Sequence, residues 1–193
     1  MFRRHHALSA LIVVAFVGVS TVGCSEDEQA TPKVTFTSEI TSGSHPSADC
    51  RETGPWLNIG SFGNVSTGEK VTPVDDGATF GQGSASVTCS VTGANDGFNI
   101  KATATLTGAQ GGSVTIEGFF RPTGENPDIA MTFSAFQKAT YTTRKCTVRY
   151  TDQLQTAAAG RVWGYFDCPE VRNDQQQRVC AASGQLRFEN CGQ

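Results

Sequence analysis

From Lys33 onward, apolar residues recur at every second position, the pattern of a strand with one buried face. The clearest case is 85–107, where the apolar positions are Val87, Cys89, Val91, Phe98, Ile100, Ala102, Ala104 and Leu106. Between them, Gly93-Ala94-Asn95-Asp96-Gly97 suits a tight turn, because Asn, Asp and Gly tolerate positive φ. We expect a β-hairpin of defined register, since a slip of one residue would expose the whole apolar set.

The same alternation predicts more strands along the chain. They are expected around 34–38, 113–120, 129–135, 140–151, 160–168 and 184–190, with shorter strand-like stretches at 56–59 and 78–80. Helical signals are nearly absent: 152–159 is long enough for one or two turns, and 170–178 is polar without a buried face. The chain therefore predicts an all-β fold, an antiparallel β-sandwich or partly open barrel, in one domain at 33–193.

The residues before this domain have the regions of a secretory signal. Arg3 and Arg4 precede an apolar run at 7–19, followed by small residues. This run is shorter than the roughly 20 apolar residues that a membrane-spanning helix needs. We expect a signal peptide at 1–23 and a polar tether at 24–32.

The end of the signal, Thr21-Val22-Gly23-Cys24, resembles the lipobox of bacterial lipoproteins. The resemblance implies cleavage before Cys24, acylation of Cys24 and a membrane anchor. Thr21 departs from the pattern, in which Leu, Val or Ile is usual at that position. Ser25 resembles the residue that sends enteric lipoproteins to the outer rather than the inner membrane. We expect a lipid-anchored protein of the bacterial cell envelope; an ordinary signal and a secreted protein is the alternative.

A second resemblance lies at the C-terminal end. The stretch Gly160-Arg161-Val162-Trp163-Gly164-Tyr165-Phe166-Asp167-Cys168-Pro169, with Cys180 and Phe188-Glu189-Asn190-Cys191 after it, is similar to uncharacterised lipoproteins of Gram-negative bacteria. It covers at most the last third of the chain and transfers no active-site residue. The resemblance implies a location in the cell envelope and nothing more specific.

The chain has seven cysteines, and setting Cys24 aside leaves an even set: Cys50, Cys89, Cys146, Cys168, Cys180 and Cys191. No C-x-x-C spacing occurs, which argues against a zinc ribbon or a thioredoxin-type redox pair. In an exported chain the set predicts three disulfides that staple the domain. We expect Cys168–Cys180 to bridge the polar stretch 169–179, with Cys50–Cys89 and Cys146–Cys191 by elimination.

The net charge of the chain limits the kinds of binding partner that we expect. The signal holds two of the 15 basic residues and none of the 18 acidic ones, which leaves 13 against 18, a net charge of −5. A mildly acidic chain without a basic patch is not expected to bind nucleic acid or anionic lipid. Attachment to the membrane therefore depends on the acyl chains.

Residues suited to catalysis are few. The mature chain contains one histidine, His45, in a Ser/Gly-rich loop, so neither a Ser-His-Asp site nor catalytic zinc is expected, and no cofactor or metal is predicted. The Asp/Asn-Gly clusters are interpreted as turns rather than calcium sites. Glu117 and Glu189 fall on polar strand positions and are the candidate carboxylates of a glycosidase-like site.

The strongest candidates for recognition are Trp163 and Tyr165. They alternate with Val162, Phe166 and Cys168, so if the half-cystine faces the core the two rings point outward. Outward rings can stack on a sugar or anchor a partner protein. The alternatives are a covering loop or the opposite orientation.

The threonines Thr103, Thr105 and Thr107 form a solvated strand face or, alternatively, a flat binding face. The favoured function is a non-catalytic, lipid-anchored binding or surface module for a glycan or an envelope protein. A small extracytoplasmic hydrolase and a purely structural envelope protein are the alternatives.

Overall fold

The computed structural model describes residues 30–193, apart from 45–48, 65–66, 81–82, 110 and 174. The predicted signal peptide, Cys24, most of the predicted tether and His45 lie outside the described residues. Every regular element in the described part is a strand, and no helix there is long and apolar enough to span a membrane. The all-β prediction is confirmed.

The strands form one 12-stranded sheet in which neighbouring strands are antiparallel. Their bounds are β1 (Lys33–Thr41), β2 (Gly54–Ile59), β3 (Val74–Asp75), β4 (Thr79–Phe80), β5 (Gly83–Ala94), β6 (Gly97–Leu106), β7 (Gly112–Phe120), β8 (Glu125–Ala135), β9 (Thr140–Arg149), β10 (Thr156–Ala158), β11 (Arg161–Asn173) and β12 (Arg178–Glu189). The helical turns considered for 152–159 are wrong, because Thr156–Ala158 pairs with β11 as a strand.

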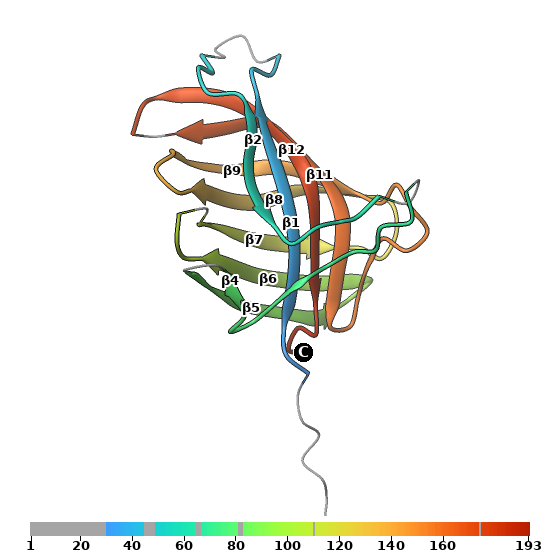
Figure 1. Cartoon of the computed structure of the whole chain (residues 1–193). Coiled ribbons are helices and arrows are strands. Elements are labelled where there is room, and N and C mark those ends of the chain that lie inside the picture. The colour runs from blue at the N-terminus through green and yellow to red at the C-terminus, as the bar shows by residue number, and fades with distance from the viewer. Residues whose placement is uncertain (1–29, 45–48, 65–66, 81–82, 110, 174) are drawn as a thin grey trace, which may run out of the picture.

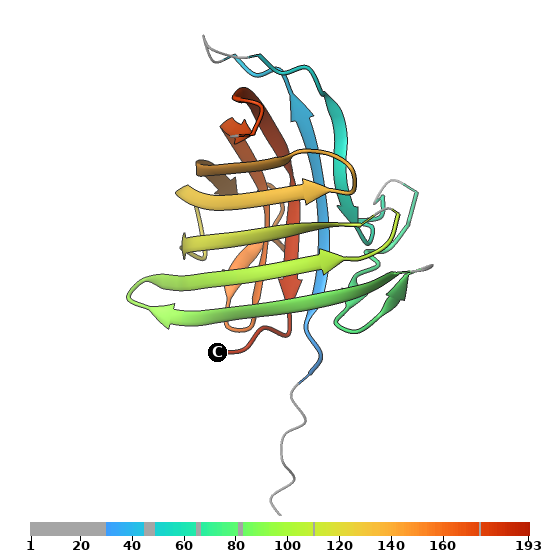
Figure 2. The ribbon, with the colours of Figure 1, turned by 90° about the vertical axis from the view of Figure 1, so that its left-hand side faces the viewer.

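The sheet curls into a half-barrel, as expected of a partly open barrel. Its strand order is β2-β1-β12-β11-β9-β8-β7-β6-β5-β4. In Figure 1 the long strands β1, β2, β11 and β12 run nearly at right angles to β5–β9, and Figure 2 shows the two groups as facing layers. The concave side holds the core, and the convex side faces outward.

Because side chains alternate along each strand, every second residue packs into the core. Phe36 of β1 stacks on Phe166 of β11, with ring centroids 5.5 Å apart, and Trp56 of β2 meets Tyr141 of β9 edge-on. The predicted hairpin at 85–107 is confirmed as β5 and β6, joined through a turn in which Asn95 has φ 49°. Local sequence periodicity therefore sets which face of these strands is buried.

In β9 the expected alternation breaks. Tyr141 is fully buried and Arg144 is exposed, although strict alternation from the buried Cys146 would bury Arg144 and expose Tyr141. The pairing of β8 and β9 shifts register on both sides of Ile129. A bulge adds a residue to one strand, so the positions that point inward before it point outward after it. This explains why the order of buried and exposed residues changes along β9.

The two ends of the sheet meet through the segment 74–80. β3 pairs with β1, and the residues that follow bind β5 through the hydrogen bonds Gly77 N–Ala85 O and Ala85 N–Ala78 O. Farther along β5, Val91 N donates to the carbonyl oxygen of Gly192. An edge strand that would otherwise offer unpaired backbone groups is thereby covered.

Three disulfides join Cys50 to Cys180, Cys89 to Cys191, and Cys146 to Cys168. The six cysteines were predicted correctly, but all three expected pairs, Cys168–Cys180, Cys50–Cys89 and Cys146–Cys191, are wrong. The polar stretch 169–179 is largely strand, so no loop there needs a bridge. The order of the strands in the sheet determines the pairing of the cysteines, since β9 lies beside β11 and brings Cys146 to Cys168.

Candidate binding face on strands β11, β12 and β1

The outer side of β11 carries the two aromatic residues singled out from the sequence. Val162, Phe166 and Cys168 are each 0% exposed and face the core. Trp163 and Tyr165 are half-buried and lie on the opposite, convex side. Both side chains therefore point outward, as the alternation predicts when Cys168 faces the core, and the reversed orientation is wrong.

Each ring is covered by an arginine from a neighbouring strand. Trp163 is in register with Arg187 of β12, whose Cζ lies 4.6 Å from the ring centroid. Tyr165 is in register with Arg149 of β9, whose Cζ lies 5.0 Å from the ring. A guanidinium over a ring is attracted by the ring quadrupole, so these contacts hold both rings in place.

The two arginines differ in their remaining partners. Arg187 donates a hydrogen bond to Glu189 at 2.7 Å and is thus neutralised locally. Arg149 is exposed and makes no ion pair within the part of the chain that the structure describes. Its N–H groups are therefore available to a ligand beside Tyr165.

Tyr165 borders an open hollow of about 290 Å³ above β1, β2 and β12. The polar residues that line it are Thr37, Ser38, Glu39, Asn58, Tyr165, Ser183 and Gln185, of which Ser38 is buried and bonded through its Oγ to the Leu57 backbone. Amides and hydroxyls both donate and accept hydrogen bonds, which suits a ligand rich in hydroxyl groups. Sequence reasoning missed Thr37, Asn58 and Gln185, because they come from three strands far apart in the chain.

A loop covers one end of this face. Thr35, in register with Arg187, is 0% exposed although it points outward. Figure 1 shows the segment between β2 and β3 crossing in front of β12 and β11, and a Cβ at Gly60 would lie 3.5 Å from the Thr35 methyl group. The Nε1 of Trp163 is also enclosed, with no hydrogen-bond partner among the described residues. Tyr165 is therefore the ring that opens onto the hollow.

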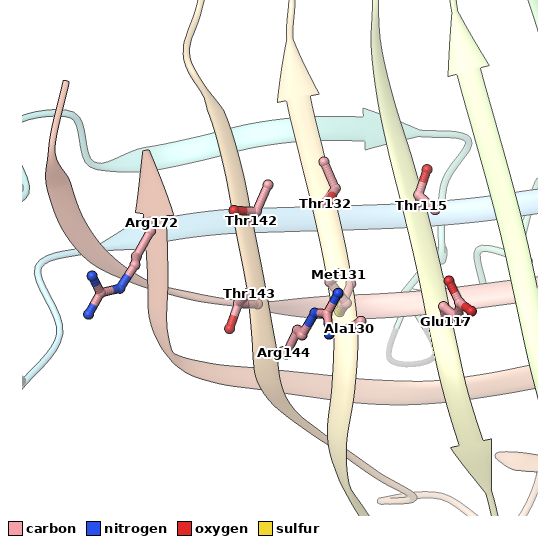
Figure 3. A pocket seen from close by; sticks show the side chains of 9 residues that line it. All are labelled: Thr115, Glu117, Ala130, Met131, Thr132, Thr142, Thr143, Arg144 and Arg172. Carbon is pink, nitrogen blue, oxygen red and sulfur yellow. The ribbon is translucent and has the colours of Figure 1, made fainter. Parts of the chain in front are cut away.

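A second hollow, of about 480 Å³, lies on the outer side of β7, β8 and β9. In Figure 3, Thr115, Thr132 and Thr142 stand in one line with Arg172 at its end. On the β7 side, Glu117 is in register with Ala130, whose short side chain leaves the space open.

Beside this second hollow, Glu170 accepts hydrogen bonds from Lys145 at 2.7 Å and from Arg172 at 2.6 Å. Bonding to these two cations lowers the pKa of Glu170 to about 2. This carboxylate is therefore ionised at neutral pH and is not suited to act as a general acid.

The two carboxylates considered for glycoside hydrolysis do not come together. Glu117 lies on β7 and Glu189 on β12, four strand positions apart in the sheet order. At about 4.8 Å per strand this is roughly 19 Å along the sheet, compared with the about 5–10 Å that glycosidase carboxyl pairs span. The described residues also contain no group of three or more His, Cys, Asp or Glu able to hold a metal ion.

Comparison with protein-family models, with curated proteins and with solved structures finds no match to this chain.

Proposed function

We propose that this protein is a non-catalytic, lipid-anchored binding module of the bacterial cell envelope, which recognises a glycan through the hollow beside Tyr165. One observation carries the proposal: an outward aromatic ring borders an open hollow lined by amide and hydroxyl side chains and by the carboxylate of Glu39. An aromatic face with a few convergent polar groups is the usual composition of a small-ligand site.

The chemistry of the lining supports a sugar ligand. The Tyr165 ring offers an apolar surface for a pyranose face, while Asn58 and Gln185 offer donors and acceptors for its hydroxyl groups. Arg149 adds an N–H cluster with no ion pair in the described part of the chain, so a glycan bearing a carboxylate or phosphate would gain a charge-assisted contact.

Three disulfides support an exported domain, because such bonds persist in oxidising compartments. The anchor itself rests on Cys24 and the lipobox-like ending of the signal. The alternative of a small hydrolase has no observation of its own, since Glu117 and Glu189 are far apart along the sheet.

Pull-down of the oxidised protein on a panel of insoluble cell-wall and capsular polysaccharides tests the proposal. The Tyr165→Ala substitution should weaken binding about tenfold, the loss of roughly one aromatic stacking contact. Phe119→Ala is a matched control, because Phe119 also points outward and lies under an arginine, Arg121, but on another strand. Equal losses in both variants, or no binding by the unchanged protein, would refute the Tyr165 site.

A further inference from the structure

The outer side of β5–β9 carries two parallel rows of hydroxyl side chains. One row is Thr88, Thr103, Thr115, Thr132 and Thr142, and the other is Ser86, Thr105, Ser113, Ser134 and Thr140. In each row, every residue is in register with its neighbour on the next strand. We call these two rows of five the hydroxyl lattice.

The lattice follows from one short pattern repeated on five strands. Each strand has a Ser or Thr, then one buried residue, then a second Ser or Thr; the buried residues are Val87, Ala104, Val114, Phe133 and Tyr141. Because side chains alternate, both hydroxyl residues of each strand point outward. The spacing is about 4.8 Å from strand to strand and about 6.7 Å along a strand.

Two hydrogen bonds within the rows hold four of the ten hydroxyl groups in place. The Oγ1 atoms of Thr103 and Thr115 lie 3.3 Å apart, and the Oγ atoms of Ser113 and Ser134 lie 3.0 Å apart. Figures 1 and 2 both show β5–β9 running side by side with only gentle fanning. The rows therefore lie on one extended face, on which Thr115, Thr132 and Thr142 also line the second hollow.

The composition of this face is unusual for a surface that only meets water. Exposed strand positions ordinarily include charged side chains, which keep a sheet soluble and unpaired. Here the charges Lys101 and Glu117 lie in the adjacent row, and Arg172 at the end of a row. Arg144 is the other charged residue that lines the hollow over Thr115, Thr132 and Thr142. No aromatic residue belongs to the lattice, so it lacks the stacking surface that Tyr165 gives to the other face.

We propose that the hydroxyl lattice binds ice. A neutral array that repeats in two directions suits a ligand that also repeats in two directions, and a hydroxyl group, like a water molecule, both donates and accepts hydrogen bonds. Charged side chains would instead orient water around themselves, and the lattice excludes them. The absence of aromatic rings favours ice over a crystalline polysaccharide, which would stack on such rings.

Adsorption to ice tests this inference. The full-length oxidised protein, labelled with a fluorophore, is offered to a slowly growing ice hemisphere, and the shape of single ice crystals is recorded in the same solution. The unchanged protein should adsorb and facet the crystals. The double substitution Thr103→Lys/Thr115→Lys should reduce adsorption at least about tenfold, because two long charged side chains hold the lattice away from the crystal.

Thr92→Lys is the matched control. Thr92 is exposed on the outer side of β5 but lies beyond both rows, so this variant should adsorb as the unchanged protein does. Thermal unfolding of all three proteins checks that the substitutions leave the fold intact. Equal adsorption by the double variant, no adsorption by the unchanged protein, or lattice-dependent binding to crystalline cellulose without binding to ice would each overturn the inference.

Discussion

The guanidinium carbon of Arg187 on β12 lies 4.6 Å from the ring centroid of Trp163 on β11. The two residues are in register, and Arg187 also bonds to Glu189 two residues farther along its strand. One arginine thus holds an outward indole against the sheet. This contact ties together the two strands whose outer sides carry the proposed glycan site.

Replacing Arg187 by alanine should therefore destabilise the protein by about 1 kcal/mol, the usual size of a partly buried cation–π contact. The free energy of unfolding, measured by urea denaturation, checks this value. Arg161→Ala is the control, because Arg161 is exposed and should change stability very little. An equal loss in the two variants would contradict a specific role for the Arg187–Trp163 contact.

The disulfides should differ in their contributions to stability. Cys89 and Cys191 are 102 residues apart in sequence, and Cys146 and Cys168 are 22 apart. In the chain-entropy model the longer loop contributes about 4.7 kcal/mol and the shorter about 3.4 kcal/mol. The double variant Cys89→Ala/Cys191→Ala should thus lose more stability than Cys146→Ala/Cys168→Ala. Denaturation of both variants tests this order, and the reverse order would show that packing at Cys146 and Cys168 outweighs loop entropy.

Glu170 should make stability depend on pH in the acid range. Its pKa is lowered from 4.5 to about 2 by hydrogen bonds from Lys145 and Arg172. A carboxyl with a lowered pKa in the folded state adds stability above pH 4.5, and this stability is lost as the pH falls toward 2.

The Glu170→Gln variant should consequently have a lower free energy of unfolding than the unchanged protein at pH 7. The difference between the two free energies should shrink as the pH falls from 4.5 to 2 and vanish below pH 2. Urea denaturation at a series of pH values measures the effect. Glu125→Gln, which replaces an exposed carboxylate, is the matched control for the loss of one negative charge. A constant difference at every pH would rule out the charge as its cause.

The junction between the two ends of the sheet depends on Asp76. Its carboxylate accepts a hydrogen bond of 2.7 Å from the backbone N–H of Val87. Asp76→Ala should cost about 1–3 kcal/mol, because a hydrogen bond to a charged group is lost, and should speed hydrogen exchange at the Val87 amide.

The adjacent Asp75 provides the control. Its ion pair with Lys33, at 3.2 Å, is partly exposed, so Asp75→Ala should cost less than about 1 kcal/mol and leave exchange at Val87 unchanged. Unchanged exchange at Val87 in the Asp76 variant would mean that the junction does not rely on this carboxylate.

The anchor proposal predicts the mass of the mature protein. Protein extracted from membranes should begin at Cys24 and carry the added mass of more than one acyl chain, because a single chain binds membranes only marginally. Intact mass spectrometry before and after reduction measures both this addition and the three disulfides. A chain that begins at Ser25 or later without acyl mass would exclude the lipoprotein, and Thr21→Leu tests whether Thr21 slows processing.

The sequence by itself determined most of the strands, the buried faces of those without a bulge, and the cysteines that form disulfides. The alternation in β5 and β6, and the outward direction of Trp163 and Tyr165, are properties of single strands, because side chains alternate along any strand. Periodicity could therefore predict them without knowledge of any partner strand.

Tertiary structure alone decided which strands are neighbours. Cys146 meets Cys168 because β9 pairs with β11, and the hollow beside Tyr165 forms because β1 and β12 bring Thr37 and Gln185 to the same face. These contacts join residues far apart in the chain, and their formation depends on the packing of the whole curled sheet around one core. No local pattern carries that information, which is why the cysteines were predictable and their pairing was not.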